Sequence, residues 1–260
     1  MDARGRPEHE EHTLNAEPSA QLTLLDLQAQ DSALAQLLHR RSSLPEHARI
    51  AELQARAEEL DGRRIEADTA VGDLTRAQSK ADAEVEHVKA RRVRDEERLS
   101  SGAITNPKDL ESLQHELGAL ERRISTLEDE ELEVMERLEE AQKALSDATS
   151  DLDTVTVELE QVTSARDSAI EAIDAETGNV TAERDRVVAQ VPDDLLALYD
   201  KVKAQYGGLA AAELRARRCE GCRLEINGAD LREIAAKPDD EVLRCPECSR
   251  ILVRTAESGL

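Results

Sequence analysis

The sequence predicts a mainly α-helical protein, in which a long antiparallel coiled-coil hairpin is followed by a small module that holds all the cysteines. Three observations support this fold class. The 260 residues include no Trp or Phe and only two Tyr, which excludes a conventional large globular core. Charged residues make up 35% of the chain, and small aliphatic residues recur at a coiled-coil spacing. All four cysteines fall in two CxxC pairs after residue 218.

The second arm of the hairpin carries the clearest pattern. Apolar residues recur at alternating steps of three and four from Leu110 to Val162, with one interruption at Glu131. Such a seven-residue repeat keeps one stripe of a helix against a partner helix, as in a left-handed coiled coil. The first arm shows the same period from Leu53 to Leu99, and the leucines between Leu22 and Leu37 continue it toward the N-terminus.

A short connection, Ser101–Asp109, joins the two arms. It contains Gly102 and the pair Asn106-Pro107, which end one helix and begin another. Because the connection is short and the arms are nearly equal in length, we expect them to fold back on each other within one chain. The rival arrangement is a parallel dimer, since an exposed seam can also pair with a second molecule.

Proline residues divide the helical part of the chain. Pro45 interrupts the first arm, with Ser43 expected to cap the helix that restarts there. Val191-Pro192 ends the second arm, after which we expect a helix over Leu195–Gln205 and a further helical stretch over Leu209–Arg217. The predicted organisation is a disordered tail at 1–17, a coiled-coil hairpin at 18–191 with its tip at about 101–109, a helical connector at 192–218, a cysteine module at 219–254 and a second tail at 255–260.

The cysteine module has the spacing of a metal site. Each CxxC pair presents two thiolates, and two such pairs complete a tetrahedral four-cysteine zinc site; the four predicted ligands are Cys219, Cys222, Cys245 and Cys248. Short strands are expected at 223–226, 241–244 and 251–254, with Asn227-Gly228 as a tight turn. A thioredoxin-like dithiol is the alternative, but it needs a βαβ context. The sequence therefore predicts a zinc ribbon that binds one structural Zn²⁺, with no open coordination position for catalysis.

The charge distribution restricts the partners. A formal net charge of -23 opposes binding of the whole surface to nucleic acid or to an anionic membrane. Arginines surround the predicted zinc site, where they could contact an anion or form a solvated face; they are Arg215, Arg217, Arg218, Arg223 and Arg250. A second basic run lies near the hairpin tip and comprises Lys89, Arg91, Arg92 and Arg94. We expect it to pair with glutamates of the opposing arm, including Glu116 and Glu121; the alternative is a second docking point at the tip.

The motifs together resemble a bacterial family of C4-type zinc-ribbon proteins with an N-terminal coiled-coil hairpin. The resemblance covers about residues 20–254 and is most specific at Cys245-Pro-Glu-Cys-Ser-Arg-Ile-Leu252. Members of the family are mostly uncharacterised. The resemblance implies a cytosolic binding protein, with some relatives acting as chaperone-like or RNA-linked regulators, and it assigns the zinc-ligand role to the same four cysteines.

These observations predict a non-enzymatic protein. The sequence contains no glycine-rich phosphate loop, and a slender two-helix rod offers no concave pocket for catalysis. We expect a cytoplasmic adaptor or chaperone-like protein that binds protein partners through its coiled coil and its zinc ribbon, with oligomerisation through the coiled coil as a further option. The alternative is a regulator that binds RNA or DNA through the arginine-rich ribbon. No membrane association is expected.

Overall fold

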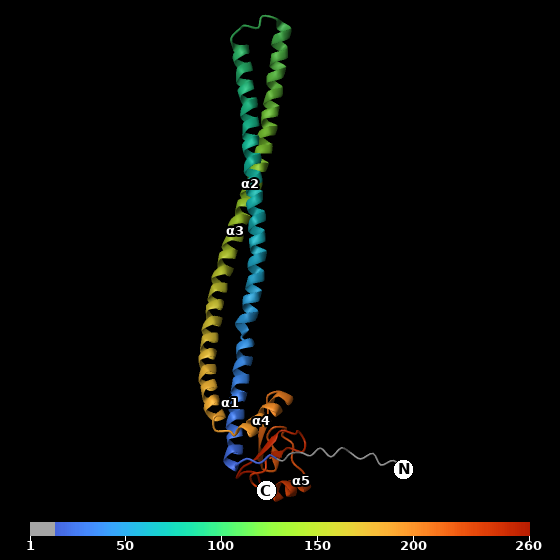
Figure 1. The fold of residues 1–260 in the computed structure, drawn as a ribbon. Coiled ribbons are helices and arrows are strands. Elements are labelled where there is room, and N and C mark those ends of the chain that lie inside the picture. Colours follow the sequence, from blue (N-terminus) through green and yellow to red (C-terminus); the bar gives the residue numbers. More distant parts are fainter. Residues whose placement is uncertain (1–13) are drawn as a thin grey trace, which may run out of the picture. The chain divides into compact units, whose positions relative to one another are not determined.

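The computed structural model describes residues 14–260 and confirms a mainly α fold with short strands (Figure 1). The elements are α1 (Pro18–Ser42), α2 (Pro45–Ser100), α3 (Pro107–Val188), α4 (Asp193–Gln205), β1 (Ala211–Arg215), β2 (Arg218–Cys219), α5 (Gly228–Ala236), β3 (Leu243–Arg244) and β4 (Ile251–Arg254). They form two compact units. The hairpin unit contains residues 45–165, and the ribbon-bearing unit contains residues 14–44 and 166–260, so that α3 contributes to both.

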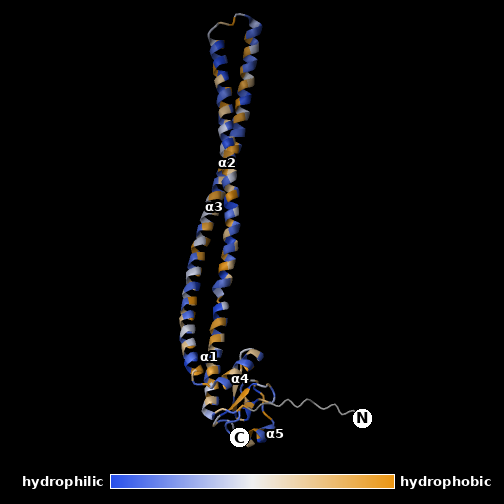
Figure 2. Ribbon diagram, viewed as in Figure 1, coloured by the Kyte–Doolittle hydropathy of each residue, from blue (hydrophilic) through white to orange (hydrophobic). Residues whose placement is uncertain are grey.

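The hairpin unit consists of α2 and the first part of α3, which run antiparallel. Arg49 of α2 forms an ion pair with Glu158 of α3 at 2.6 Å, and Lys89, much farther along α2, pairs with Glu128 at 2.8 Å. Figure 2 shows apolar residues recurring along both helices, as the heptads predict. The seam buries Leu53, Leu60 and Val85 of α2 together with Leu113, Leu120, Ile124, Leu127, Leu138 and Ala148 of α3.

The basic run near the tip forms ion pairs within the hairpin. Besides the pair made by Lys89, Arg91 forms an ion pair with Glu116 of the opposing helix, as the sequence analysis expected. Arg92 pairs with Glu96 one turn farther along its own helix at 3.4 Å. These contacts account for much of the local positive charge without a second molecule.

The tip is shorter than predicted. Ser100 ends α2 and Pro107 begins α3, where a proline at the first helical position needs no hydrogen-bond partner for its nitrogen. Asn106 accepts a hydrogen bond at its Oδ1 from the backbone N–H of Lys108 at 3.1 Å. Gly102 has a φ of 71°, a conformation that glycine adopts without strain.

The break between α1 and α2 lies where Pro45 predicts it, but Ser43 acts differently from our expectation. Its hydroxyl donates to the carbonyl of His39 at 2.8 Å, so Ser43 ends α1 and does not cap α2. Pro45 itself is the first residue of α2. At this break, the hydroxyl of Ser43 satisfies a carbonyl at the C-terminus of α1, and a proline occupies the first position of α2.

The ribbon-bearing unit has a packed apolar core. Side chains from α1, α4 and the sheet meet there, and its members include Leu24, Leu27, Val187, Val191, Leu195, Tyr199, Val202, Ile251 and Val253. A second cluster lies beneath the cysteines and contains Leu214, Ile226, Ile234, Leu243 and Leu252. Both clusters are assembled from segments far apart in the sequence.

A buried carboxylate lies beside the first core. The side chain of Asp31 is 2% exposed and lies 2.7 Å from Arg184 Nε and 2.7 Å from Lys203 Nζ. Tyr199 donates its hydroxyl to Asp31 at 2.7 Å. Burial alone would raise the pKa of Asp31, but hydrogen bonds from Lys203, Arg184 and Tyr199 outweigh it and lower that pKa. The network joins α1, α3 and α4 within this unit.

The four strands form one sheet in the order β2-β1-β4-β3. β1 pairs in parallel with β4, while the β1–β2 and β3–β4 pairs are antiparallel. This corrects the predicted helical stretch over Leu209–Arg217, because Ala211–Arg215 is a strand. Ala and Leu favour helices, but pairing with β4 and burial of Ala211, Ala212 and Leu214 outweigh that propensity.

Two further expectations for the module are corrected. The pair Asn227-Gly228 begins helix α5 and is not a tight turn: Asn227 Oδ1 accepts hydrogen bonds from the backbone N–H groups of Ala229 and Asp230, both at 3.0 Å. The strand predicted at 223–226 is reduced to a single bridge between Arg218 and Glu225.

The segments predicted as tails form hydrogen bonds where the structure describes them, residues 14–17 with the loop before β3 and residues 255–260 with β1. Ala16 donates its backbone N–H to Asp240 at 2.7 Å, and Val242 donates to Leu14 at 2.9 Å. The structure therefore corrects the predicted tail for residues 14–17, while residues 1–13 lie outside the described part. Residues 255–260 are also held, because the hydroxyl of Ser258 is buried and donates to Leu214 at 2.9 Å.

Candidate metal centre

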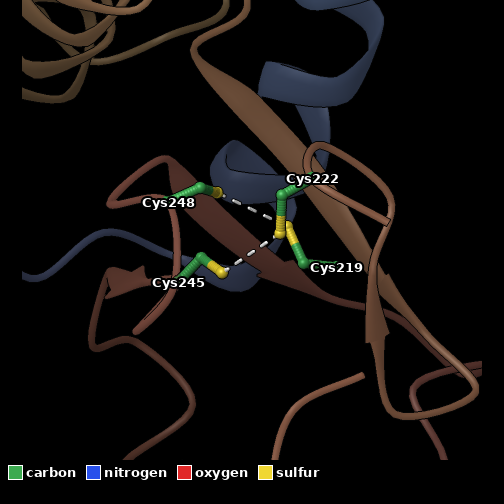
Figure 3. Close-up of side chains that lie close together, drawn as sticks. All are labelled: Cys219, Cys222, Cys245 and Cys248. Atoms are coloured by element: carbon green, nitrogen blue, oxygen red, sulfur yellow. Dashed lines mark hydrogen bonds between the residues drawn. The ribbon is translucent and has the colours of Figure 1, made fainter. Parts of the chain in front are cut away.

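The two CxxC loops place all four cysteines around one point (Figure 3). Cys219 ends β2 and Cys245 follows β3 directly, so the sheet sets the position of one cysteine in each loop. The four sulfur atoms lie within 4.8 Å of one another. The Sγ atoms of Cys219 and Cys248 are 3.9 Å apart, and those of Cys222 and Cys245 are also 3.9 Å apart.

The two loops share one backbone conformation. The N–H of Arg223 donates to the carbonyl of Cys219 at 2.7 Å, and the N–H of Ser249 donates to Cys245 at 2.8 Å. Arg223 and Ser249, each four residues after the first cysteine of its loop, have φ values of 61° and 59°. Each first cysteine also donates its N–H to the residue five positions later. The module is thus a pair of matching knuckles that face each other.

These distances fit a zinc ion. Zn–S bonds of about 2.3 Å in a tetrahedron separate the sulfurs by about 3.8 Å. Two of the six sulfur separations are 3.9 Å and all lie within 4.8 Å, so that a shift of at most about 1 Å in any pair would accept the ion. Four thiolates complete the coordination of zinc, so such a centre holds structure and leaves no position for a reacting water.

The local environment acts differently on the individual thiols. Burial raises the pKa of Cys219 and the pKa of Cys245. Burial acts in the same direction on Cys248, but hydrogen bonds from the backbone and side chain of Arg250 outweigh it and lower the pKa of Cys248. Binding of an ion must therefore displace protons from at least two thiols, which makes metal affinity fall as the pH falls.

Comparison with known proteins matches both parts of the chain. A family model described as the CT398-like coiled coil hairpin domain matches residues 27–207. The chain belongs to this family. A second model, the C4-type zinc ribbon domain, matches residues 218–252 and includes all four cysteines. The resemblance drawn from the sequence motifs is confirmed.

Two mycobacterial relatives of this CT398-like chain are described as uncharacterised proteins. The Mycobacterium tuberculosis protein Rv2229c is 36% identical over 241 residues, which cover 93% of this chain and 98% of the relative. The Mycobacterium leprae protein ML1638 is 30% identical and covers 85% of this chain and 94% of its own length. A Mycobacterium smegmatis structure has a TM-score of 0.80 at 37% identity and covers 93% of this chain and all of its own. CT398 of Chlamydia trachomatis, at 16% identity over 91% of this chain and 98% of its own, shares the fold with a TM-score of 0.66.

Gly221 and Arg250 pack against the knuckles in this CT398-like chain. A Cβ on Gly221 would lie 2.9 Å from the Cβ of Ala212, 3.2 Å from Cδ of Arg250 and 3.5 Å from Sγ of Cys219. The Nε–H of Arg250 donates to the carbonyl of Leu209 at 2.9 Å. Its guanidinium carbon lies 5.6 Å from the ring centroid of Tyr206. Arg250 thus bridges the two knuckles and the segment before β1.

The five predicted anion-contact arginines have different surroundings. Arg215 forms an ion pair with Glu257 at 2.7 Å, and Arg217 donates from Nε to the carbonyl of Gly259 at 3.2 Å. Arg250 has the bridging role described above. Arg218 and Arg223 are exposed and form no ion pair with any residue in the range 14–260. Of the five side chains, those of Arg218 and Arg223 are therefore the most accessible to an anion.

Three features of the ribbon-bearing unit were not predicted: the buried Gln28, whose Oε1 accepts the backbone N–H of Ala210 at 2.6 Å, the buried Asp31, and the close packing of Gly221. A signal existed for the first two, because Gln28 and Asp31 continue the apolar stripe of Leu24 at steps of four and three and are polar. For Gly221 the signal is a glycine inside the first CxxC, a position where the absence of a side chain indicates close packing. Nothing in the sequence predicts the positive φ values of Arg223 and Ser249, since glycine is the usual residue in that conformation.

Among residues 14–260, no helix is long and apolar enough to cross a membrane.

Proposed function

We propose that this CT398-like protein is a non-enzymatic adaptor or chaperone-like protein that binds a protein partner along the acidic outer face of α3. The observation that carries the proposal is a separation of charge within the hairpin unit. From Glu128 to Glu160, α3 carries 13 Asp and Glu residues, of which Glu128 and Glu158 pair with α2, but only two Lys and Arg residues. A partner with a basic surface fits this face, because complementary potentials steer association and fix orientation.

The acidic face also offers apolar contacts. Leu132 is 56% exposed and Val157 is 52% exposed, both at positions that point away from the seam. Glu133, Glu136 and Glu140 lie near Leu132 and are exposed, without an ion pair to any other described residue. Exposed apolar side chains among unpaired carboxylates suit a partner whose basic side chains flank an apolar one.

Capture from a cell lysate, with and without nuclease, tests this proposal. The combined change Glu133→Lys, Glu136→Lys and Glu140→Lys should abolish capture of protein partners. The matched control is Glu58→Lys, Glu66→Lys and Asp68→Lys on α2, which alters the net charge equally and should retain capture. Equal loss in both variants would attribute binding to total charge and reject the proposed face.

We further propose that each chain binds one zinc ion, which holds the ribbon together in the reducing cytoplasm. Four thiols whose sulfur atoms lie within 4.8 Å of one another, two pairs of them at 3.9 Å, support this proposal. Metal analysis of the purified protein should find one zinc per chain, and none after all four cysteines are replaced by serine. Iron in place of zinc, or a substoichiometric metal content that reconstitution does not raise, would contradict it.

A nucleic-acid regulator is the second candidate, supported by the exposed and unpaired side chains of Arg218 and Arg223. If RNA or DNA is the ligand, affinity should fall steeply with salt, since released counterions drive such binding. The combined change Arg218→Gln and Arg223→Gln should then remove nucleic acid from the captured material. Capture of protein that survives nuclease favours the adaptor.

A further inference from the structure

The segment that follows β4, Thr255–Gly259, lies against the turn that leads into the first knuckle. We call it the β4 extension. The turn joins β1 to β2 through Ala216 and Arg217, since Arg215 pairs with Arg218. Ala216 has a φ of 44° and Arg217 a φ of 66°. Two consecutive residues at positive φ form the hairpin turn that Asn-Gly normally occupies, and Ala and Arg are poorly suited to it.

The β4 extension bonds to both residues of this turn. The backbone N–H of Ala216 donates to the carbonyl of Glu257 at 2.8 Å, and that of Arg217 donates to Ser258 at 2.9 Å. Arg217 also donates from Nε to the carbonyl of Gly259 at 3.2 Å. The unfavourable conformation is therefore held by contacts from outside the turn.

The β4 extension is itself anchored. Ser258 is 3% exposed, and its hydroxyl donates to the carbonyl of Leu214 at 2.9 Å. Thr255 donates its hydroxyl to Glu213 at 2.8 Å and its backbone N–H to Ser258 Oγ at 2.8 Å. Anchors on β1 and bonds to the turn make the extension and the β1–β2 hairpin one hydrogen-bonded structure.

The turn sets the place of the first two ligands. Cys219 lies two residues after Arg217 and pairs across the ladder with Leu214. The carbonyl of Arg217 also accepts the N–H of Ile226 at 2.9 Å, which closes the first knuckle from its far side. We infer that the β4 extension positions Cys219 and Cys222 for the metal by holding the Ala216–Arg217 turn. This inference rests on the zinc binding proposed above.

Zinc affinity of a protein shortened to end at Arg254 tests the inference. Competition with a chelator should show an affinity lower by about tenfold or more than that of the full chain, because the turn loses its external bonds. A chain that ends at Gly259 lacks only the exposed Leu260 and should bind zinc as the full chain does. The single change Ser258→Ala, which removes only the buried hydroxyl, should lower the affinity by about fivefold.

A rescue separates positioning from general loss of stability. In the chain that ends at Arg254, the combined change Ala216→Asn and Arg217→Gly supplies the residues that favour this turn without outside help, and it should restore the zinc affinity. If the shortened chain does not fold, the same rescue is applied to Ser258→Ala. An unchanged affinity after shortening, or a failed rescue, overturns the inference. Absence of zinc from the full chain would instead overturn the metal proposal.

Discussion

The two units of the molecule are stabilised in different ways. Of the twelve largest fully buried side chains among residues 14–260, only Leu60 lies in the hairpin unit. The hairpin relies on a narrow seam and on exposed ion pairs such as Arg56 with Glu59. The ribbon-bearing unit concentrates its contacts in two small cores, a buried carboxylate and the cysteine cluster. Single substitutions should therefore have large effects in the ribbon-bearing unit and small ones in the hairpin.

Spectroscopy can follow the two units separately. Both tyrosines of the chain, Tyr199 and Tyr206, lie in the ribbon-bearing unit, and the chain has no tryptophan. Tyrosine fluorescence therefore reports on that unit alone, while far-ultraviolet circular dichroism is dominated by the long helices α2 and α3.

Loss of one of the four proposed zinc ligands should have the largest effect. Cys219→Ser removes one of four ligands, and structural zinc supplies roughly 10 kcal/mol or more to the folding of small modules. The ribbon should lose its fold while circular dichroism of the long helices changes little. A cooperative loss of all helix signal at the same temperature as the fluorescence change would contradict the separation of the two units.

Replacement of the buried carboxylate should rank second. Asp31→Asn leaves Arg184 and Lys203 without their counter-charge and should cost about 3 kcal/mol in urea unfolding followed by tyrosine fluorescence. Tyr199→Phe removes one hydrogen bond to the same carboxylate and should cost about 1 kcal/mol.

The same carboxylate gives a dependence on pH. Because folding lowers the pKa of Asp31 below its ordinary value of 3.8, its contribution is present above that value and is lost as the pH falls through the lower folded-state pKa. The stability difference between the wild type and Asp31→Asn should accordingly shrink in acid. A difference that grew as the pH fell would reject this assignment.

A pair of glycine substitutions compares the units directly. Gly221→Ala places a Cβ 2.9 Å from the Cβ of Ala212 and should destabilise the ribbon-bearing unit by about 2 kcal/mol. Gly62→Ala, in the middle of α2, meets no atom within 4 Å and should stabilise the hairpin by about 0.5 to 1 kcal/mol. Thermal unfolding of the two variants should show opposite signs. Stabilisation in both would contradict the packing at Gly221, and destabilisation in both would contradict the open space at Gly62.

Removal of an exposed ion pair should have the smallest effect. Glu158→Gln breaks the pair with Arg49, in which both side chains remain more than 40% exposed. The midpoint of thermal unfolding should fall by less than Gly62→Ala raises it, and the difference should vanish in about 1 M salt. A large shift that persists at high salt would show that the hairpin depends on specific charge pairs more than on its seam.

Features that depend on neighbouring residues could be predicted from the sequence. The heptads predict the hairpin because an apolar period of 3.5 residues sustained over many turns is typical of a coiled coil. Pro45 and Pro192 predict the helix boundaries at which they lie. The spacing of the two CxxC pairs likewise predicts that the four cysteines meet, which the structure confirms.

Features that depend on contacts between residues far apart in the sequence could not be predicted. Ala211–Arg215 becomes a strand because β4, some forty residues later, pairs with it and because Gln28 Oε1 accepts the N–H of Ala210 at 2.6 Å. The left-handed conformations of Arg223 and Ser249 follow from closure of the knuckles around the cysteines. The sequence predicts tails at 14–17 and 255–260 because the hydrogen-bond partners of these segments lie far from them along the chain.

On the metal binding proposed above, the ribbon needs an ion to fold and the hairpin does not. Hydrogen exchange of the intact protein, measured with zinc bound and after removal of the metal by a chelator, tests this claim most directly. We expect the amides of Cys219–Ile226 and Cys245–Ile251 to lose their protection without zinc, while those of α2 stay protected. Continued protection of both knuckles in metal-free protein would contradict it.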